Sequence, residues 1–232
     1  MISARFFSGK NPQAILFDLD GTLVDSVPDI AMALMGAFKE LGLPEPTEGQ
    51  IREWVGNGAF KLAQRGLAWA KRVDDNAVDT AELDQLYASF LRHYQTTSGI
   101  HSRLYPGVSD ALARWQQQAM PMAVVTNKPL QFVPSLLTSL GIADYFSVLV
   151  GGECVAERKP SPMMLLHACE QLGVTPENCL MVGDSRNDVE AARAAMMPVV
   201  AVGYGYNHGR PVAEEKPDWV ISNLMELLVL PV

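Results

Sequence analysis

Short, continuous apolar runs separated by helical patterns constrain the fold of this 232-residue chain more than any other feature of its sequence. Continuous rather than alternating apolar residues are typical of strands buried on both faces, as in parallel sheets. Five such runs are rich in β-branched residues or bounded by turn residues: AILF (14–17), MAVVT (122–126), SVLVGG (147–152), CLMVGD (179–184) and PVVAVGYG (198–205). WVIS (219–222) is a candidate sixth strand.

Helical patterns lie between the later strands, at residues 134–141, 161–173 and 188–196. Strands and helices in alternation are typical of a sheet covered by helices. The sequence therefore predicts an α/β fold with a doubly wound, mostly parallel sheet and a Rossmann-like core.

The segment between the first two strands departs from this alternation. Roughly 100 residues separate them, which is too long for a single crossover helix. A first helix, ended by Gly42 and Pro44, is predicted from apolar residues at helical spacing: Ile30, Leu34, Phe38 and Leu41. Ser26 with Asp29 is a candidate capping box at its start. Three more helices are predicted, at 47–55, 59–72 and 81–95.

We therefore predict two structural units. Residues 26–98 form an inserted α-helical cap domain, and residues 1–25 and 99–232 form the α/β core.

Charge and composition restrict the partners of the chain. The formal net charge is −8 at pH 7, and an acidic surface disfavours nucleic acid and anionic membranes as partners. No apolar run approaches the ~20 residues of a membrane span. The start, MISARFFSGKNPQ, lacks the apolar stretch of a signal peptide and is interpreted as a leader to the first strand. We expect a cytoplasmic protein with no nucleic-acid or membrane partner.

Cysteine and histidine spacings favour structural roles. Cys154, Cys169 and Cys179 form no CxxC motif, and we expect buried thiols in a reducing cytoplasm. The four histidines lie far apart and lack the spacing of zinc ligands.

Carboxylate, hydroxyl, amide and lysine side chains follow three of the predicted strands. The first strand leads into Asp18-Leu19-Asp20, the second into Thr126-Asn127-Lys128, and the fourth into Gly183-Asp184-Ser185, with Asp188 soon after. Arg158-Lys159-Pro160 lies in a loop before the next helix. Functional groups of a parallel sheet gather beyond the carboxyl ends of its strands. Carboxylate oxygens suit a hard cation, here expected to be Mg²⁺, which together with a lysine would attract a phosphate.

Each motif also has a simpler interpretation. DLDG (18–21) resembles part of a Ca²⁺-binding loop, but that loop needs glycine where this chain has Leu23. It could equally be an acidic surface turn, and GDSRND could be a helix start capped by Ser185 and Asp188. The other two motifs could be a polar and a basic loop. Taken together, the four simple interpretations would leave unexplained why all four motifs lie after predicted strands in this order. A shared functional site explains it.

DLDGTLVDS, VVTNK, RKPSP and VGDSRND together resemble the four motifs of the haloacid dehalogenase-like hydrolases, and the insertion stands where that family has its helical cap. The resemblance implies phosphoryl transfer through an aspartyl-phosphate, with Mg²⁺ as cofactor. It implies that Asp18 is the nucleophile and Asp20 the general acid and base. An acid at position 20 favours phosphate esters over haloalkanoates, whose leaving group needs no proton.

The same resemblance implies the binding groups. Thr126, Asn127 and Lys159 would hold or orient the phosphate oxygens. Asp20 would contribute its backbone carbonyl to the metal, and Asp188 would act through a water or by orienting its neighbours. The metal site as a whole would comprise four acidic residues: Asp18, Asp20, Asp184 and Asp188.

The cap is expected to determine the substrate specificity. WVGNGA (54–59) opens a helix and leaves backbone N–H groups near Gly58 free for an anion. Lys61 and Arg65 follow on one helix face. They form either a solvated basic edge or a site in which Arg65 or Lys61 recognises a second anionic group, such as a carboxylate.

Four segments, WVGNGA, TNKP, VGDSRNDVEAA and GYGYNHG, are similar to the bacterial phosphoglycolate phosphatases within the family, whose substrates carry a carboxylate beside the phosphate ester. The similarity implies hydrolysis of 2-phosphoglycolate to glycolate and phosphate, by a monomer or homodimer that binds a small phosphorylated metabolite. One departure lies at Met196-Met197, near which the family usually has a glycine that ends the helix in a left-handed conformation. A methionine there would cost about 1 kcal/mol without touching a catalytic residue.

Other functions agree with the same motifs. The substrate could be another small phosphate, namely a sugar or amino-sugar phosphate, pyrophosphate or a nucleotide. A phosphomutase would keep the phosphoenzyme and pass the phosphoryl group to a sugar. A non-catalytic binding module would keep only the fold, although Asp18 and Asp20 are both intact.

Overall fold

The computed structural model describes residue 7 and residues 11–228, so most of the expected leader lies outside the described residues. All six predicted strands are confirmed: β1 Ala14–Phe17, β4 Met122–Val125, β5 Val148–Val150, β6 Cys179–Gly183, β7 Val199–Val202 and β8 Trp219–Ile221. They form one sheet in the order β5-β4-β1-β6-β7-β8, and every neighbouring pair is parallel. The first and fourth predicted strands, β1 and β6, are therefore neighbours at its centre.

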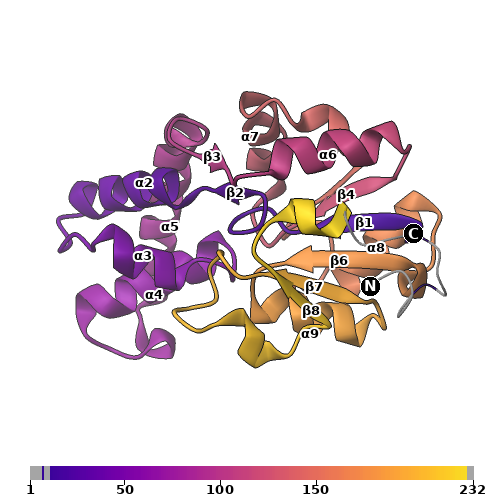
Figure 1. The fold of residues 1–232 in the computed structure, drawn as a ribbon. Coiled ribbons are helices and arrows are strands. Elements are labelled where there is room, and N and C mark those ends of the chain that lie inside the picture. The colour runs from indigo at the N-terminus through magenta and orange to yellow at the C-terminus, as the bar shows by residue number, and fades with distance from the viewer. Residues whose placement is uncertain (1–6, 8–10, 229–232) are drawn as a thin grey trace.

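Helices cover both faces of this sheet, which confirms the doubly wound α/β fold (Figure 1). One face carries α6 Val108–Gln117 and α7 Val133–Ser139, and the other carries α8 Met163–Leu172 and α9 Arg186–Ala194. Ile15 and Phe17 of β1 pack on the α6 and α7 side, whereas Ala14 and Leu16 pack on the α8 and α9 side. Because side chains alternate along a strand, one continuous apolar run supplies both cores.

The insertion between β1 and β4 forms a helical bundle beside the sheet (Figure 1). Its four predicted helices are confirmed: α2 Val27–Glu40, α3 Glu48–Trp54, α4 Ala59–Lys71 and α5 Thr80–Thr97. Ile30, Leu34 and Phe38 are buried in α2, whereas Leu41 lies past its end and is exposed. The bundle has its own hydrophobic cluster, which Phe132 and Tyr206 of the sheet domain join.

The connections between the bundle and the sheet were not predicted. β2 Val24–Asp25 pairs antiparallel with β3 Arg103–Leu104, so the two chain crossings lie side by side. Helix α6, which follows β3, was also missed, although its buried residues fall at helical spacing: Val108, Ala111, Leu112 and Trp115. Short 3₁₀-helices complete the loops: Asp75–Ala77, Leu130–Phe132, Ala143–Tyr145, Pro176–Asn178, Val212–Glu215 and Leu224–Leu228.

The predicted capping box of Ser26 and Asp29 is wrong. The Ser26 side chain makes no cap hydrogen bond and donates instead to Asp20 Oδ1 (2.6 Å). The buried Asp29 carboxylate accepts from the backbone N–H groups of Gly99 (2.8 Å), His101 (2.7 Å) and Ser102 (3.0 Å). Asp29 thus links the start of α2 to the segment after α5, where the chain returns to the core. These hydrogen bonds are buried or half-buried, and backbone N–H groups in such places need acceptors.

The end of α9 agrees with the expectation for Met196. Its backbone is left-handed, with φ 55°, and its side chain is 80% exposed. The N–H groups of Met196 and Met197 donate to the carbonyls of Arg193 and Ala192 and close the helix end.

The three cysteines are free thiols, as expected. Cys169 and Cys179 are buried, but Cys154 is only half-buried. It lies in the loop after β5, where its Sγ accepts from the Gly151 N–H (3.2 Å).

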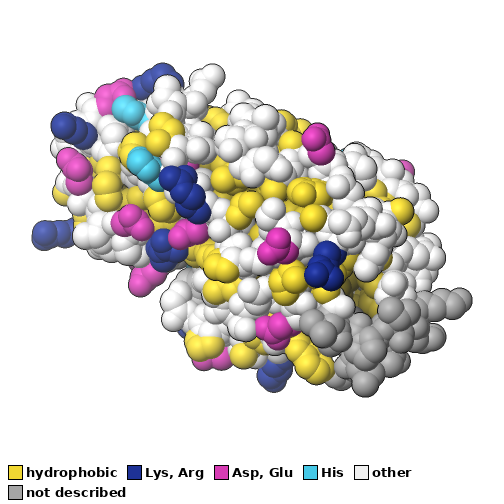
Figure 2. All heavy atoms as spheres, turned by 45° about the horizontal axis from the view of Figure 1, so that its top comes forward, with side chains coloured by type: hydrophobic (Ala, Val, Ile, Leu, Met, Phe, Trp, Pro, Cys, Tyr) yellow, Lys and Arg dark blue, Asp and Glu magenta, His cyan; other side chains and the backbone are white. Residues whose placement is uncertain are grey.

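Charged side chains gather over the helical bundle (Figure 2). Several pair with each other, as Arg92 does with Glu40 (2.6 Å) and Lys71 with Glu82 (2.6 Å). Among the residues that the structure describes, no helix is both long and apolar enough to cross a membrane.

Candidate active site

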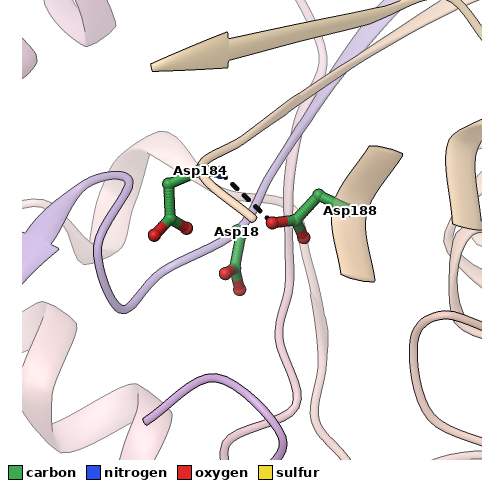
Figure 3. A group of neighbouring side chains, drawn as sticks. All are labelled: Asp18, Asp184 and Asp188. Atoms are coloured by element: carbon green, nitrogen blue, oxygen red, sulfur yellow. Dashed lines mark hydrogen bonds between the residues drawn. The ribbon is translucent and has the colours of Figure 1, made fainter. Parts of the chain in front are cut away.

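Two neighbouring strands bring the first and fourth motifs together. Phe17 at the end of β1 is paired with Val182 of β6, so Asp18 and Asp184 meet at the carboxyl edge of the sheet. Asp188, in the first turn of α9, completes a group of three buried carboxylates with ligand atoms within 4.8 Å of one another. Figure 3 shows these side chains gathered at two strand ends and one helix.

Lys159 places a positive charge inside this acidic group. Its Nζ lies 2.9 Å from Asp18 Oδ1 and 2.6 Å from Asp188 Oδ1, and it donates to the Val125 carbonyl (2.7 Å). The Asn127 side chain holds the backbone of Lys159 by two hydrogen bonds, one to its carbonyl and one from its N–H (both 3.0 Å). The second motif therefore positions the third.

Asp188 orients the fourth motif. Its Oδ2 accepts from the N–H groups of Asp184 (3.2 Å) and Ser185 (3.1 Å) and from the Ser185 hydroxyl (2.8 Å). A side chain at Gly183 would collide with Asp188. With Lys159 on the other oxygen, both carboxylate oxygens of Asp188 are engaged, which supports an orienting role.

Asp184 fits into the site because glycines surround it. A Cβ at Gly21 or Gly205 would collide with its side chain, and Gly21 has the positive φ of 90° that glycine adopts without strain. The Asp184 carboxylate accepts from Thr22 Oγ1 (3.0 Å) and from the Tyr206 N–H. The turn of the first motif thus also supports the fourth.

The acidic group holds more negative charge than its surroundings balance. Burial raises the pKa of Asp18 to about 6 against the pull of Lys159, and burial together with Asp188 and Asp18 raises the pKa of Asp184 well above its usual value. Burial acts to lower the pKa of Lys159, but Asp18 and Asp188 hold it above its usual value, so this lysine stays charged. One ammonium does not neutralise three buried carboxylates.

The carboxylate group fits a divalent cation. Its donors are oxygens, which hard cations prefer, and Asp18 Oδ1 is buried with no well-oriented hydrogen bond from the described residues beyond its ion pair with Lys159. A cation would supply the missing positive charge and keep Asp18 and Asp184 ionised. Asp18, Asp184 and Asp188 therefore form a group able to hold a metal, and the side chain of Asp20 is not part of it.

The Asp20 side chain contacts a second lysine. Both of its carboxylate oxygens contact Lys128 Nζ (3.0 and 3.1 Å), and Oδ1 also accepts from the Ser26 hydroxyl. Burial acts to lower the pKa of Lys128, but Asp20 holds it above its usual value. Asp18 and Asp20 thus pair with different lysines.

A cleft of about 500 Å³, partly open to solvent, lies between the bundle and the strand ends. Its polar side comes from the first two motifs: Asp18, Asp20, Thr126, Asn127 and Lys128. Its bundle side is mainly apolar: Ile30, Val55, Leu62, Phe90 and Tyr94. The cleft therefore has polar and charged side chains on its core side, called its floor, and apolar side chains on its bundle side, called its roof.

The loop Gly56–Gly58 of the bundle contacts the core beside this cleft. The Gly56 carbonyl accepts from the side-chain amides of Asn127 (3.1 Å) and Asn187 (3.2 Å), and the Asn57 amide donates to Asn187 Oδ1 (3.2 Å). Gly58 lines the cleft with φ 85°, and a side chain there would meet Arg158 and the Asn127 carbonyl.

Arg65 and Lys61 are not among the residues that line the cleft. Arg65 donates to the Trp54 carbonyl (2.8 Å), and Lys61 pairs with Asp75 (2.9 Å). Both contacts lie within the bundle. Recognition of a carboxylate by Arg65 or Lys61 stays a prediction.

Three residues at the site were not predicted: Lys128, Asn187 and Tyr206. Lys128 and Asn187 stand inside TNK and GDSRND, so the motifs themselves carried a signal. Tyr206 stands inside GYGYNHG, a segment that carried the family resemblance but to which no role in the site was assigned. Its N–H meets Asp184, while its hydroxyl accepts from the Ser26 N–H (3.1 Å) and donates to Asp25.

Known proteins share this sequence and fold. The sequence model of the haloacid dehalogenase-like hydrolases matches residues 15–202. A phosphoglycolate phosphatase of Nitrosococcus oceani is 45% identical, covering 94% of this chain and 96% of that protein, and one of Pseudomonas putida is 44% identical, covering 97% and 81%. The crystal structure of a predicted phosphoglycolate phosphatase from Haemophilus somnus has a TM-score of 0.88 and 38% identity, covering 94% of this chain and 97% of that one.

Proposed function

The chain belongs to the haloacid dehalogenase-like hydrolase family, and we propose that it is a phosphatase that hydrolyses 2-phosphoglycolate to glycolate and phosphate. The observation that carries the proposal is the pairing of Asp18 with Lys159 inside a carboxylate group able to hold a metal. The similarity to phosphoglycolate phosphatases supports the choice of substrate.

Asp18 acts as the nucleophile and Asp20 moves the proton. A carboxylate oxygen of Asp18 attacks phosphorus while the bond from phosphorus to the ester oxygen breaks, and the departing alkoxide takes the proton of Asp20. Water then attacks phosphorus, Asp20 accepts a proton from it, and phosphate leaves as Asp18 is restored. Both carboxylates line the cleft, which supports this division of work.

The phosphate oxygens are held by Thr126 and Lys159, and Asn127 positions Lys159 by two hydrogen bonds to its backbone. The charge of Lys159 lets an anionic substrate approach the anionic Asp18.

Mg²⁺ is the proposed cofactor, and when bound it would offset charge on the phosphoryl oxygens. Asp18, Asp184 and the backbone carbonyl of Asp20 would hold it. Asp188 keeps Asp184 and Lys159 in place through its hydrogen bonds.

Residues 26–98 act as a cap over the core of residues 1–25 and 99–232. Closure excludes water from the phosphoryl group. The backbone at Gly58 faces the substrate, while Arg65 holds the loop through the Trp54 carbonyl. We further propose a cytoplasmic protein that acts as a monomer or homodimer.

A phosphate-release assay tests the proposal. With Mg²⁺, purified protein should release phosphate and glycolate from 2-phosphoglycolate with a higher kcat/KM than from sugar phosphates, amino-sugar phosphates, nucleotides or pyrophosphate. Asp18→Asn and chelation of the metal should each abolish release, whereas Asp144→Asn, which changes an exposed carboxylate, should not. Unchanged activity in Asp18→Asn would overturn the mechanism, and an isomerised sugar phosphate without free phosphate would indicate a phosphomutase.

A further inference from the structure

Lys128 is the only lysine or arginine among the described residues that line the cleft. Its side chain is buried, 5% of the residue being exposed, on the floor of the cleft beside Asp20. A buried ammonium needs acceptors for its three N–H groups.

The two buried lysines of the site differ in how far their donors are used. Lys159 Nζ has oxygens of three different residues around it: Asp18, Asp188 and Val125. Among the described residues, Lys128 Nζ contacts the oxygens of one carboxylate only, that of Asp20. Otherwise it lies 4.6 Å from the centre of the Tyr94 ring, with the uncharged hydroxyl of that tyrosine nearby. Lys128 thus retains donor capacity for another anion.

Lys128 is positioned to contact an anionic group carried by the leaving group of the substrate. As general acid, Asp20 must come within about 2.6–3.2 Å of the ester oxygen. In 2-phosphoglycolate the carboxyl carbon is two bonds from that oxygen. A cation in contact with both oxygens of Asp20 therefore lies within reach of the substrate carboxylate.

We propose that Lys128 binds the carboxylate of the substrate and so selects phosphate monoesters that carry a carboxylate next to the ester carbon. Lys128 is then shared between Asp20 and the substrate. The inference rests on the proposed phosphatase function and assigns to the core a recognition that the sequence predicted for the cap.

The cap strengthens this contact without supplying a charge. The Tyr94 ring of α5 stacks on Lys128, and Phe90, Leu62 and Ile30 surround the cleft with apolar surface. Removing water lowers the local dielectric, so the pairing of an ammonium with a carboxylate gains strength.

Paired substrates test the proposal. 2-Phosphoglycolate and ethyl phosphate both have an alkoxide leaving group that needs the proton of Asp20, but only the first carries a carboxylate. In Lys128→Met, we expect kcat/KM for 2-phosphoglycolate to fall about 100-fold, mainly through KM. The ratio of kcat/KM between the two esters should fall at least tenfold.

Further variants keep the test decisive. Lys128→Gln retains a hydrogen-bond donor for Asp20 and should show the same loss of selectivity, so the result does not depend on the folding of Lys128→Met. Lys128→Arg should preserve the ratio. Lys39→Met, which removes a charge from an exposed position in α2, is the matched control and should change neither ester.

Three results would contradict the proposal, and each would point to a different conclusion. An unchanged ratio in folded Lys128→Met or Lys128→Gln would mean that Lys128 serves Asp20 alone and would overturn the assignment. A selective loss in Arg65→Met instead would return carboxylate recognition to the cap. Unmodified protein that hydrolyses neither ester with Mg²⁺ would refute the phosphatase function itself.

Discussion

Asp18 and Asp20 stand two positions apart in the chain, but each has its own lysine. Asp18 lies 2.9 Å from Lys159, and Asp20 lies 3.0 Å from Lys128. Because each carboxylate pairs with a different lysine, their protonation can differ. Asp18 can then attack phosphorus while Asp20 carries a proton.

The raised pKa of Asp18 predicts a pH dependence of metal binding. Burial holds this pKa at about 6, so below that pH a proton must leave before the metal can bind. Between pH 7.5 and pH 5 the apparent Kd for Mg²⁺ should rise about tenfold or more, because one unit below a pKa only about one carboxyl in ten is ionised. Calorimetric titration at both pH values measures this. Asp144→Asn should behave like the unmodified protein, and a constant Kd would contradict the prediction.

Met196 predicts a stabilising substitution. Its φ of 55° is strained for any residue with a Cβ, and its side chain is exposed. Met196→Gly should raise the free energy of unfolding by about 1 kcal/mol, as measured by urea denaturation. Ala194→Gly introduces the same residue two positions earlier, in an exposed part of α9, and should lower stability by roughly 0.5–1 kcal/mol. The same sign of change in both variants would refute the explanation.

Among the elements, the loop before α4 holds the bundle against the core. Gly56 and Asn57 meet Asn127, which follows β4, and Asn187, at the start of α9. The loop before α4 is thus hydrogen-bonded to two of the motifs that build the site.

Asn187→Ala should weaken closure, because it removes two of these three hydrogen bonds. At about 1 kcal/mol each, kcat/KM should fall roughly tenfold to thirtyfold. The loss should be equal for 2-phosphoglycolate and ethyl phosphate, since this contact touches no carboxylate. Asn57→Ala should lose less, and the double variant no more than Asn187→Ala, because the two residues share a bond. Fully additive losses would show that they act separately. Asn178→Ala, at the opposite end of β6, is the control.

Over the whole molecule, a net charge of −8 surrounds a site that holds three buried carboxylates. Such a site destabilises the folded chain until a cation binds.

Metal binding should therefore stabilise the whole protein. Mg²⁺ at a hundred times its Kd adds about 2.7 kcal/mol to the free energy of unfolding, which raises Tm by several degrees. Thermal denaturation with and without Mg²⁺ measures the shift, and a chelator should reverse it. Asp184→Asn, which removes one ligand, should abolish most of it. An equal shift in Asp184→Asn would place the metal elsewhere.

Most of the predicted elements had a readable apolar pattern, although α6 was missed in spite of one. Helix α2 repeats Ile30, Leu34 and Phe38 on one face, and β1 is apolar throughout. The strands β2 and β3 were missed because two residues hold no period. The capping box failed because local spacing cannot show that Asp29 meets N–H groups that follow α5.

The α/β fold, the inserted helices and the acidic motifs at the strand ends follow from the amino-acid sequence, because apolar patterns and residue types are local properties. The pairing of charges depends on the folded chain. Lys159 pairs with Asp18 and Asp188, Lys128 pairs with Asp20 under the Tyr94 ring, and Arg65 turns to a backbone carbonyl. The two lysine contacts join segments far apart in the chain, and a buried charge is stable only where the fold brings it to a partner.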